Sequence, residues 1–120
     1  MLRRSPLLLV LVVLAACGGG GGGGGAKQGA STQPCPASAV IVHMQDIRFA
    51  PDKTTVKVGQ TVCWLNHDDI QHDAVADGKQ FRSSLFGKDG TFSWKAAKAG
   101  TVKYVCTVHP GMDGELDVSG

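Results

Sequence analysis

The sequence has no marked excess of charge of either sign. Its 12 lysine and arginine residues against 10 aspartate and glutamate residues give a formal charge of +2, which falls to zero without Arg3 and Arg4 at the N-terminus. The lysines do not cluster, and the aromatic content of 6% offers no platform for stacking bases. A balanced charge without a basic patch excludes nucleic acid as the expected partner.

The N-terminal region has no apolar run long enough to cross a membrane. Residues 7–16 form an apolar run of ten, whereas a transmembrane helix needs about 20 residues. Arg3 and Arg4 precede this run, as in an export signal. The run ends in Leu-Ala-Ala-Cys at 14–17, which resembles the lipobox of bacterial lipoproteins. That resemblance implies a signal peptide at 1–16, acylation of Cys17 and a lipid anchor on a bacterial membrane, on the periplasmic side or the outer face of the cytoplasmic membrane.

An ordinary secretory leader followed by a chance cysteine is the alternative. Leu14 argues against it, because a plain cleavage site prefers a small residue at that position. Eight consecutive glycines follow at 18–25, and small and polar residues continue to Pro34. We expect residues 17–34 to form a lipidated, flexible linker that spans about 20 to 25 Å. Residues 35–120 then form one small domain.

The domain shows no helical periodicity. Short alternating or β-branched runs are interrupted by Gly, Pro, Asn and Asp every 8 to 12 residues or so, which predicts an all-β sandwich or barrel. The predicted strands are 39–44, 54–58, 61–66, 72–76, 91–95, 101–106 and 115–118. We expect the aromatic residues Trp64, Phe92 and Trp94 to face inward, while residues 77–90 give no clear pattern.

Three potential metal ligands follow one another near the C-terminus. Cys106, His109 and Met112 place a thiolate, an imidazole and a thioether at intervals of three residues. This set of soft and borderline donors favours copper over zinc, which rarely binds methionine. His72 is the natural second imidazole, because it follows a polar loop at 66–71. Alone, Met112 would be core filling and His72 a surface histidine, but the combination predicts a copper site.

Such a ligand set predicts single-electron transfer. Two imidazoles and a thiolate with a weak axial thioether suit both oxidation states of copper, so little rearrangement accompanies the transfer. The sequence offers no ligands for a second metal or an open coordination position, and we therefore expect no enzyme. The alternative is a copper carrier or reservoir that delivers copper to another protein.

Residues 42–118 resemble the plastocyanin and amicyanin branch of the cupredoxins. The matching stretches are Phe49-Ala50-Pro51, residues 56–59 (VKVG), residues 61–66 (TVCWLN), His72, residues 100–106 (GTVKYVC) and residues 109–114 (HPGMDG). The resemblance implies a two-sheet Greek-key sandwich with one type 1 (blue) copper ion held by His72, Cys106, His109 and Met112. It also implies that a monomer exchanges electrons with redox partner proteins that dock at the partly exposed His109.

Asp73 departs from the pattern of the family, which often has asparagine directly after the first histidine ligand. A carboxylate can accept backbone donors as the amide does, but its charge should favour Cu(II) and lower the reduction potential. We expect the Asp73→Asn substitution to raise the potential. Asp68, Asp69 and Asp113 lie on the same loops, so they form either an acidic surface that steers a basic partner or merely a solvated loop.

Cys35 and Cys63 remain once Cys17 and Cys106 are assigned. In the topology that the resemblance implies, the first strand neighbours the third, which brings Cys35 close to Cys63. An oxidising exterior favours their pairing as a disulfide, with free thiols as the alternative. His43 and His67 have no companions at ligand spacing, so we interpret them as ordinary surface or loop histidines.

Overall fold

The computed structural model describes residues 28–120. The predicted signal peptide, Cys17 and the glycine run lie outside the described residues. None of the residues from 28 onward forms a helix that could cross a lipid bilayer.

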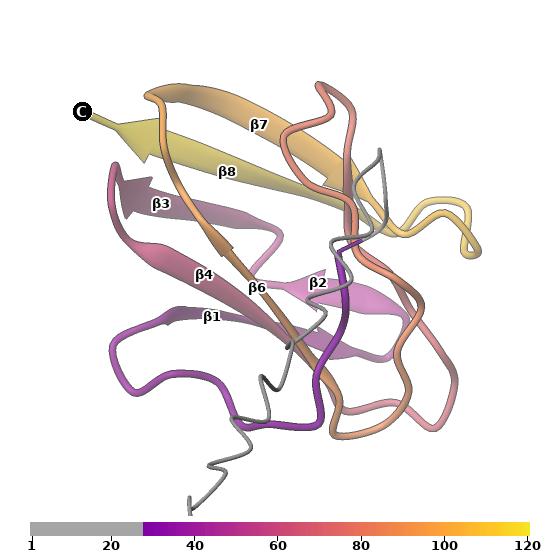
Figure 1. Ribbon diagram of the computed structural model, residues 1–120. Coiled ribbons are helices and arrows are strands. Elements are labelled where there is room, and N and C mark those ends of the chain that lie inside the picture. The colour runs from indigo at the N-terminus through magenta and orange to yellow at the C-terminus, as the bar shows by residue number, and fades with distance from the viewer. Residues whose placement is uncertain (1–27) are drawn as a thin grey trace, which may run out of the picture.

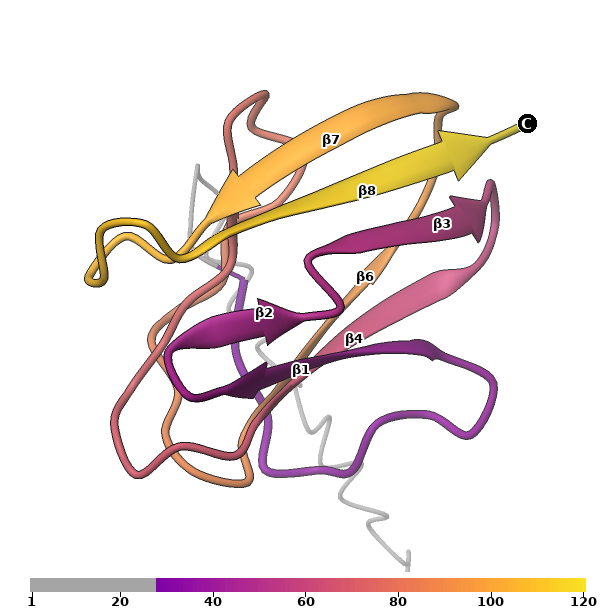
Figure 2. The ribbon, with the colours of Figure 1, turned by 180° about the vertical axis from the view of Figure 1, so that it is seen from behind.

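Two four-stranded sheets pack face to face (Figures 1 and 2). The strands are β1 (Val40–Gln45), β2 (Arg48–Ala50), β3 (Lys53–Lys57), β4 (Thr61–Asn66), β5 (Val75–Ala76), β6 (Thr91–Lys95), β7 (Gly100–Val105) and β8 (Asp113–Ser119). One sheet has the order β2-β1-β4-β6 and the other the order β3-β8-β7-β5. The predicted all-β, two-sheet fold is confirmed.

Alternation of side chains along the strands forms the core between the sheets. Tyr104 of β7 contacts the opposite sheet, with its ring 5.4 Å from that of Trp64 on β4 and 4.7 Å from that of Phe49 on β2. Trp64, Phe92 and Tyr104 are almost completely buried, as predicted for the first two, while Trp94 is half-buried against the core. This packed interior holds the strand ends in place.

The strand predictions are wrong at two points that concern the site. Strand β2 was not predicted, and the predicted strand 72–76 is reduced to the two residues of β5. His72 instead pairs with Phe86 in an isolated bridge, and the Ala74 amide donates to Ser83 Oγ. Residues 81–86 thus provide hydrogen-bond partners for the backbone of residues 72–76, which were predicted to pair with a regular strand.

The first described residues are attached to the sandwich. Gln28 and Ser31 form bridges to Ser83 and Thr91, and Thr91 Oγ1 donates to the Gln33 carbonyl at 2.6 Å. Residues 28–34 were predicted as part of the flexible linker, yet these contacts hold them against the domain. The rest of the predicted linker, residues 17–27, lies outside the described residues.

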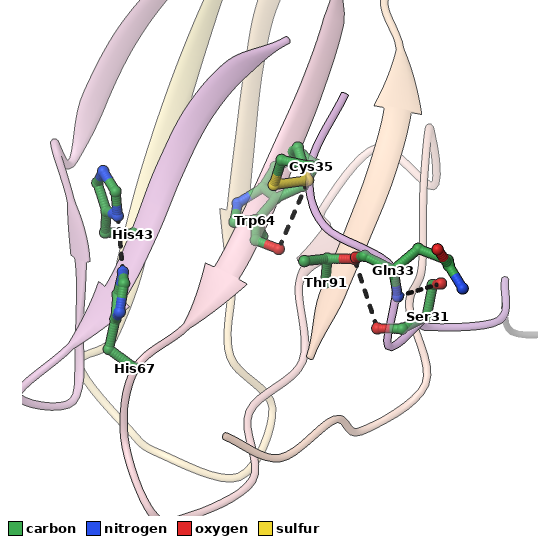
Figure 3. The surroundings of a disulfide bond; sticks show 8 residues. Ser31, Gln33, Cys35, His43, Trp64, His67 and Thr91 are labelled. Carbon is green, nitrogen blue, oxygen red and sulfur yellow. Dashed lines mark hydrogen bonds between the residues drawn. A yellow bond between two sulfur atoms is a disulfide. The ribbon is translucent and has the colours of Figure 1, made fainter. Parts of the chain in front are cut away.

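Cys35 and Cys63 form a disulfide in the structure (Figure 3). Strand β1 pairs in parallel with β4, with Ile41 opposite Cys63, so the first predicted strand does neighbour the third. Cys63 is fully buried although it lies on the face of β4 opposite to Trp64, because the segment that carries Cys35 covers it. The bridge ties that segment to the sheet.

Candidate metal centre

Three predicted ligands meet at one end of the sandwich. The Nδ1 atoms of His72 and His109 lie 3.1 Å apart, and Cys106 Sγ lies 3.8 and 3.4 Å from them. Their donor atoms all fall within 4.8 Å of one another. His72 and Cys106 are buried and His109 is half-buried, so the donors are largely screened from water while one imidazole reaches the surface.

The His72 ring is fixed from behind by a carboxylate. Its Nε2 donates to Asp68 Oδ2 at 2.8 Å, which leaves the Nδ1 lone pair directed towards Cys106 and His109. Backbone hydrogen bonds with Phe86 in both directions hold the residue itself. The orientation of this ligand is therefore set before any metal binds.

Asp68 owes its own position to the turn between β1 and β2. The amides of Asp46 and Ile47 donate to its two carboxylate oxygens at 2.9 and 3.0 Å. Desolvation alone would raise the pKa of the Asp68 carboxyl, but the hydrogen bonds from Ile47, His72 and Asp46 outweigh it and hold the pKa below its usual value. Asp68 thus remains anionic next to His72.

Asn66 organises the loop that carries these residues. Its buried amide Nδ2 donates to the carbonyls of Ile70 and Phe86, and its Oδ1 accepts from the Asp68 amide at 2.8 Å. Two of these bonds close the loop that runs from β4 to His72 on itself, and the third ties it to Phe86, whose backbone pairs with His72. The loop is a closed unit although it has no regular secondary structure.

The other three predicted ligands lie on the loop between β7 and β8, which projects from the end of the sandwich (Figures 1 and 2). Cys106 directly follows β7, and its amide donates to the Met112 carbonyl at 3.0 Å, while the Met112 amide donates to the His109 carbonyl. Gly111 has a φ of +86°, which glycine adopts without strain. Met112 is buried directly beside this turn.

Asp73 links the two ligand-bearing loops. Its carboxylate accepts from the Thr107 amide at 2.7 Å and from the Thr107 hydroxyl at 2.5 Å. Asp73 is 5% exposed, so its charge lies inside the protein next to the ligand loop. The Asp68 carboxylate also points inward, towards His72. Of the aspartates considered as an acidic surface on these loops, Asp69 and Asp113 are therefore the exposed ones.

The protein environment alone does not favour a thiolate at Cys106. Burial raises the pKa of its thiol, and the backbone amides of Asp73 and Val108 act in the opposite direction without cancelling that effect. A thiolate here needs a further positive charge. A metal ion bound among the donors would supply it.

The donor set fits a copper ion. A first-row ion bonded in a plane at about 2 Å to nitrogen and about 2.3 Å to sulfur separates its donors by about 3.5 to 3.8 Å. The three donor separations of 3.1, 3.4 and 3.8 Å lie close to that range. Two imidazoles and one thiolate that converge in this way are typical of a mononuclear copper protein, here built on a two-sheet sandwich.

Comparison with known proteins identifies the family. Residues 37–119 match the family described as copper binding proteins, plastocyanin/azurin family. The chain belongs to this family, and the expected resemblance to cupredoxins and the expected copper cofactor are confirmed. Cupredoxins such as amicyanin and plastocyanin are electron carriers rather than enzymes, and the chain belongs to that class.

Individual relatives agree with this result. Amicyanin of Paracoccus versutus is 31% identical over 88 residues, which cover 69% of this chain and 67% of that protein. Amicyanin of Paracoccus denitrificans is 29% identical over 67% of this chain and 65% of its own length. The chain therefore spans about two thirds of the Paracoccus amicyanins.

Solved structures of amicyanin share the fold. A reduced Cu(I) amicyanin variant superposes with a TM-score of 0.68 at 28% identity, covering 74% of this chain and 90% of that one. An oxidised variant gives a TM-score of 0.71 at 25% identity, covering 78% and 94%. The Greek-key cupredoxin sandwich predicted from the sequence is thereby confirmed.

Sequence reasoning missed two residues that shape the centre. Asp68 was considered only as a possible surface charge, and Asn66 only as the end of a strand and the start of the polar loop. Both belong to the loop 66–72, where several polar side chains precede a histidine. A carboxylate four residues before a metal-binding histidine is a signal that could have suggested their contact.

Proposed function

We propose that this protein is a membrane-tethered, extracytoplasmic carrier of single electrons. The observation that carries the proposal is the convergence of the His72, Cys106 and His109 donors within 4.8 Å, with two of the three residues buried. Copper, when bound, supplies a Cu(II)/Cu(I) couple. Asp68 fixes the His72 ring, and Asp73 ties the loop of His72 to Thr107 on the other ligand loop. We therefore expect the positions of the donor atoms to change little between Cu(II) and Cu(I).

In this proposal His72, Cys106, His109 and Met112 would hold the copper ion. Met112 is 2% exposed and its backbone closes the loop onto Cys106 and His109. Asp73 acts through the loop rather than as a ligand, because both its oxygens accept from Thr107. The buried inner donors favour retention of copper, and for this reason we prefer an electron carrier to a protein that hands copper on.

Redox partners are proposed to dock at the end where His109 reaches the surface. Val108 beside it is 48% exposed and Ile70 on the neighbouring loop is 42% exposed. Exposed apolar side chains on the two ligand-bearing loops suit brief, largely apolar contacts with a partner protein. All four proposed ligands come from one chain, so this proposal needs only a monomer.

The membrane tether is proposed from the sequence of residues 1–34. A signal peptide at 1–16 and an acylated Cys17 would place the domain outside the cytoplasm on a bacterial membrane. The disulfide between Cys35 and Cys63 is in keeping with an oxidising compartment. Acyl labelling that persists in the Cys17→Ser variant would contradict this part of the proposal.

The carrier function is tested by repeated redox cycling in the presence of a copper chelator. An electron carrier should pass through many cycles with an oxidant and a reductant of small size and keep its copper throughout. The matched comparison is the Met112→Ala variant, in which the site is opened. Transfer of copper from the wild-type protein to the chelator upon each reduction would favour delivery of copper instead.

A further inference from the structure

Two histidines outside the copper centre lie in contact on the outer surface of the sandwich (Figure 3). His43 Nδ1 and His67 Nε2 are 2.8 Å apart, and the ring centroids are 5.0 Å apart at an interplanar angle of 29°, so the two rings meet edge to edge. His43 is half-buried and His67 is exposed. Neither histidine has a companion at ligand spacing in the sequence, but the fold brings these two positions, 24 residues apart, into contact.

The backbone of both residues is fixed by the sheet. His43 pairs with Ala50 of β2 on one side and with Leu65 of β4 on the other. The His67 amide donates to the Met44 carbonyl at 2.8 Å, which extends the pairing of β1 with β4 by one residue. The two imidazoles thus project from neighbouring, rigidly held positions, and this arrangement lowers the entropic cost of binding a shared ligand.

We propose that His43 and His67 form a second metal site, which binds a divalent cation of the zinc, copper(II) or nickel class through His43 Nδ1 and His67 Nε2. Imidazole is a preferred ligand of these ions. Two nitrogens bonded at about 2.0 to 2.1 Å to a tetrahedral ion lie about 3.4 Å apart. From the separation of 2.8 Å, the exposed His67 side chain needs to open by only about 0.6 Å.

The hydrogen bond between the rings indicates that the nitrogens already face one another. In the neutral pair one ring donates N–H to the lone pair of the other. When that proton moves to the outward nitrogen of its own ring, both lone pairs point into the gap and can bind one cation. Water completes the coordination shell on the exposed side.

Zinc titration of the copper-loaded, reduced protein tests this site, because both Zn²⁺ and Cu(I) are diamagnetic and allow imidazole resonances to be followed by NMR. We expect the resonances of His43 and His67 to shift together and to saturate at one zinc per chain, while those of His72 and His109 stay in place. Either His43→Ala or His67→Ala should weaken zinc binding by about 100-fold, since a two-point attachment becomes single.

The matched control is Gln45→Ala, which removes an exposed side chain two residues along β1 and should leave zinc affinity unchanged. Thermal unfolding of each variant checks that the fold is intact. Absence of any shift at millimolar zinc in the wild-type protein would overturn the proposal. So would a shift of one of the two rings alone, or wild-type affinity in His43→Ala.

Discussion

Replacing Asp68 with asparagine should raise the reduction potential of the copper site. The Asp68 carboxylate accepts a hydrogen bond of 2.8 Å from His72 Nε2, on the side of the ring away from the other donors. Its side chain is 16% exposed and that of His72 is completely buried, so solvent screens the charge only partly. A fixed negative charge there stabilises Cu(II) relative to Cu(I), and its removal favours reduction.

The size of the effect follows from the distance. The hydrogen bond, the imidazole ring and a metal–nitrogen bond together put the charge about 7 Å from the metal. At an effective dielectric constant of about 20, the interaction is worth about 2.4 kcal/mol. This energy corresponds to about 100 mV for a one-electron couple, and partial screening makes 50 to 100 mV the expected order of magnitude.

Voltammetry of the purified variants measures this shift. The control is Asp69→Asn, which removes the same charge from the next residue, where the carboxylate is exposed and pairs with Lys88 at 3.2 Å. We expect its potential to stay close to that of the wild type. Equal shifts in both variants would show that only general surface charge matters, and an unchanged potential in Asp68→Asn would refute the reasoning.

Three further predictions concern stability, each measured by urea unfolding. The double substitution of Cys35 and Cys63 by alanine should lower the free energy of unfolding by about 3.5 kcal/mol, because the bridge closes a loop of 28 residues; an unchanged midpoint would contradict this. Gly114→Ala should cost about 1 to 3 kcal/mol or more, since the added methyl group would overlap the Tyr104 ring, and a loss below that range would show that the ring can move. Ile47→Gly should raise the free energy of unfolding by about 1 kcal/mol, because Ile47 has a φ of +58°, which strains a residue that carries a Cβ atom. A lower free energy of unfolding would mean that the contacts of the Ile47 side chain outweigh this strain.

The copper ligands could be predicted from the sequence because their chemistry is local. Cys106, His109 and Met112 lie within seven residues of one another, and their donor types already select copper. The alternation of apolar and polar residues, from which most strands were predicted, is likewise visible within a few neighbouring residues. His72 could be chosen because few other histidines follow a polar loop.

The support of the site could not be predicted in the same way. Asp68 contacts His72 only because the turn at Asp46 and Ile47 brings two amides to the carboxylate from more than 20 residues away. A β-branched residue with positive φ is not expected in such a turn, so strand β2 was overlooked. The contact between His43 and His67 likewise depends on the parallel pairing of β1 with β4, which sequence spacing does not reveal.

A copper–thiolate bond at Cys106 is the feature on which the proposed electron transfer depends most directly. Absorption spectroscopy of the oxidised, copper-loaded protein should show an intense charge-transfer band in the visible range, and the Cys106→Ser variant should lack it. A wild-type protein that binds copper and remains colourless when oxidised, or a band that survives in Cys106→Ser, would contradict the account.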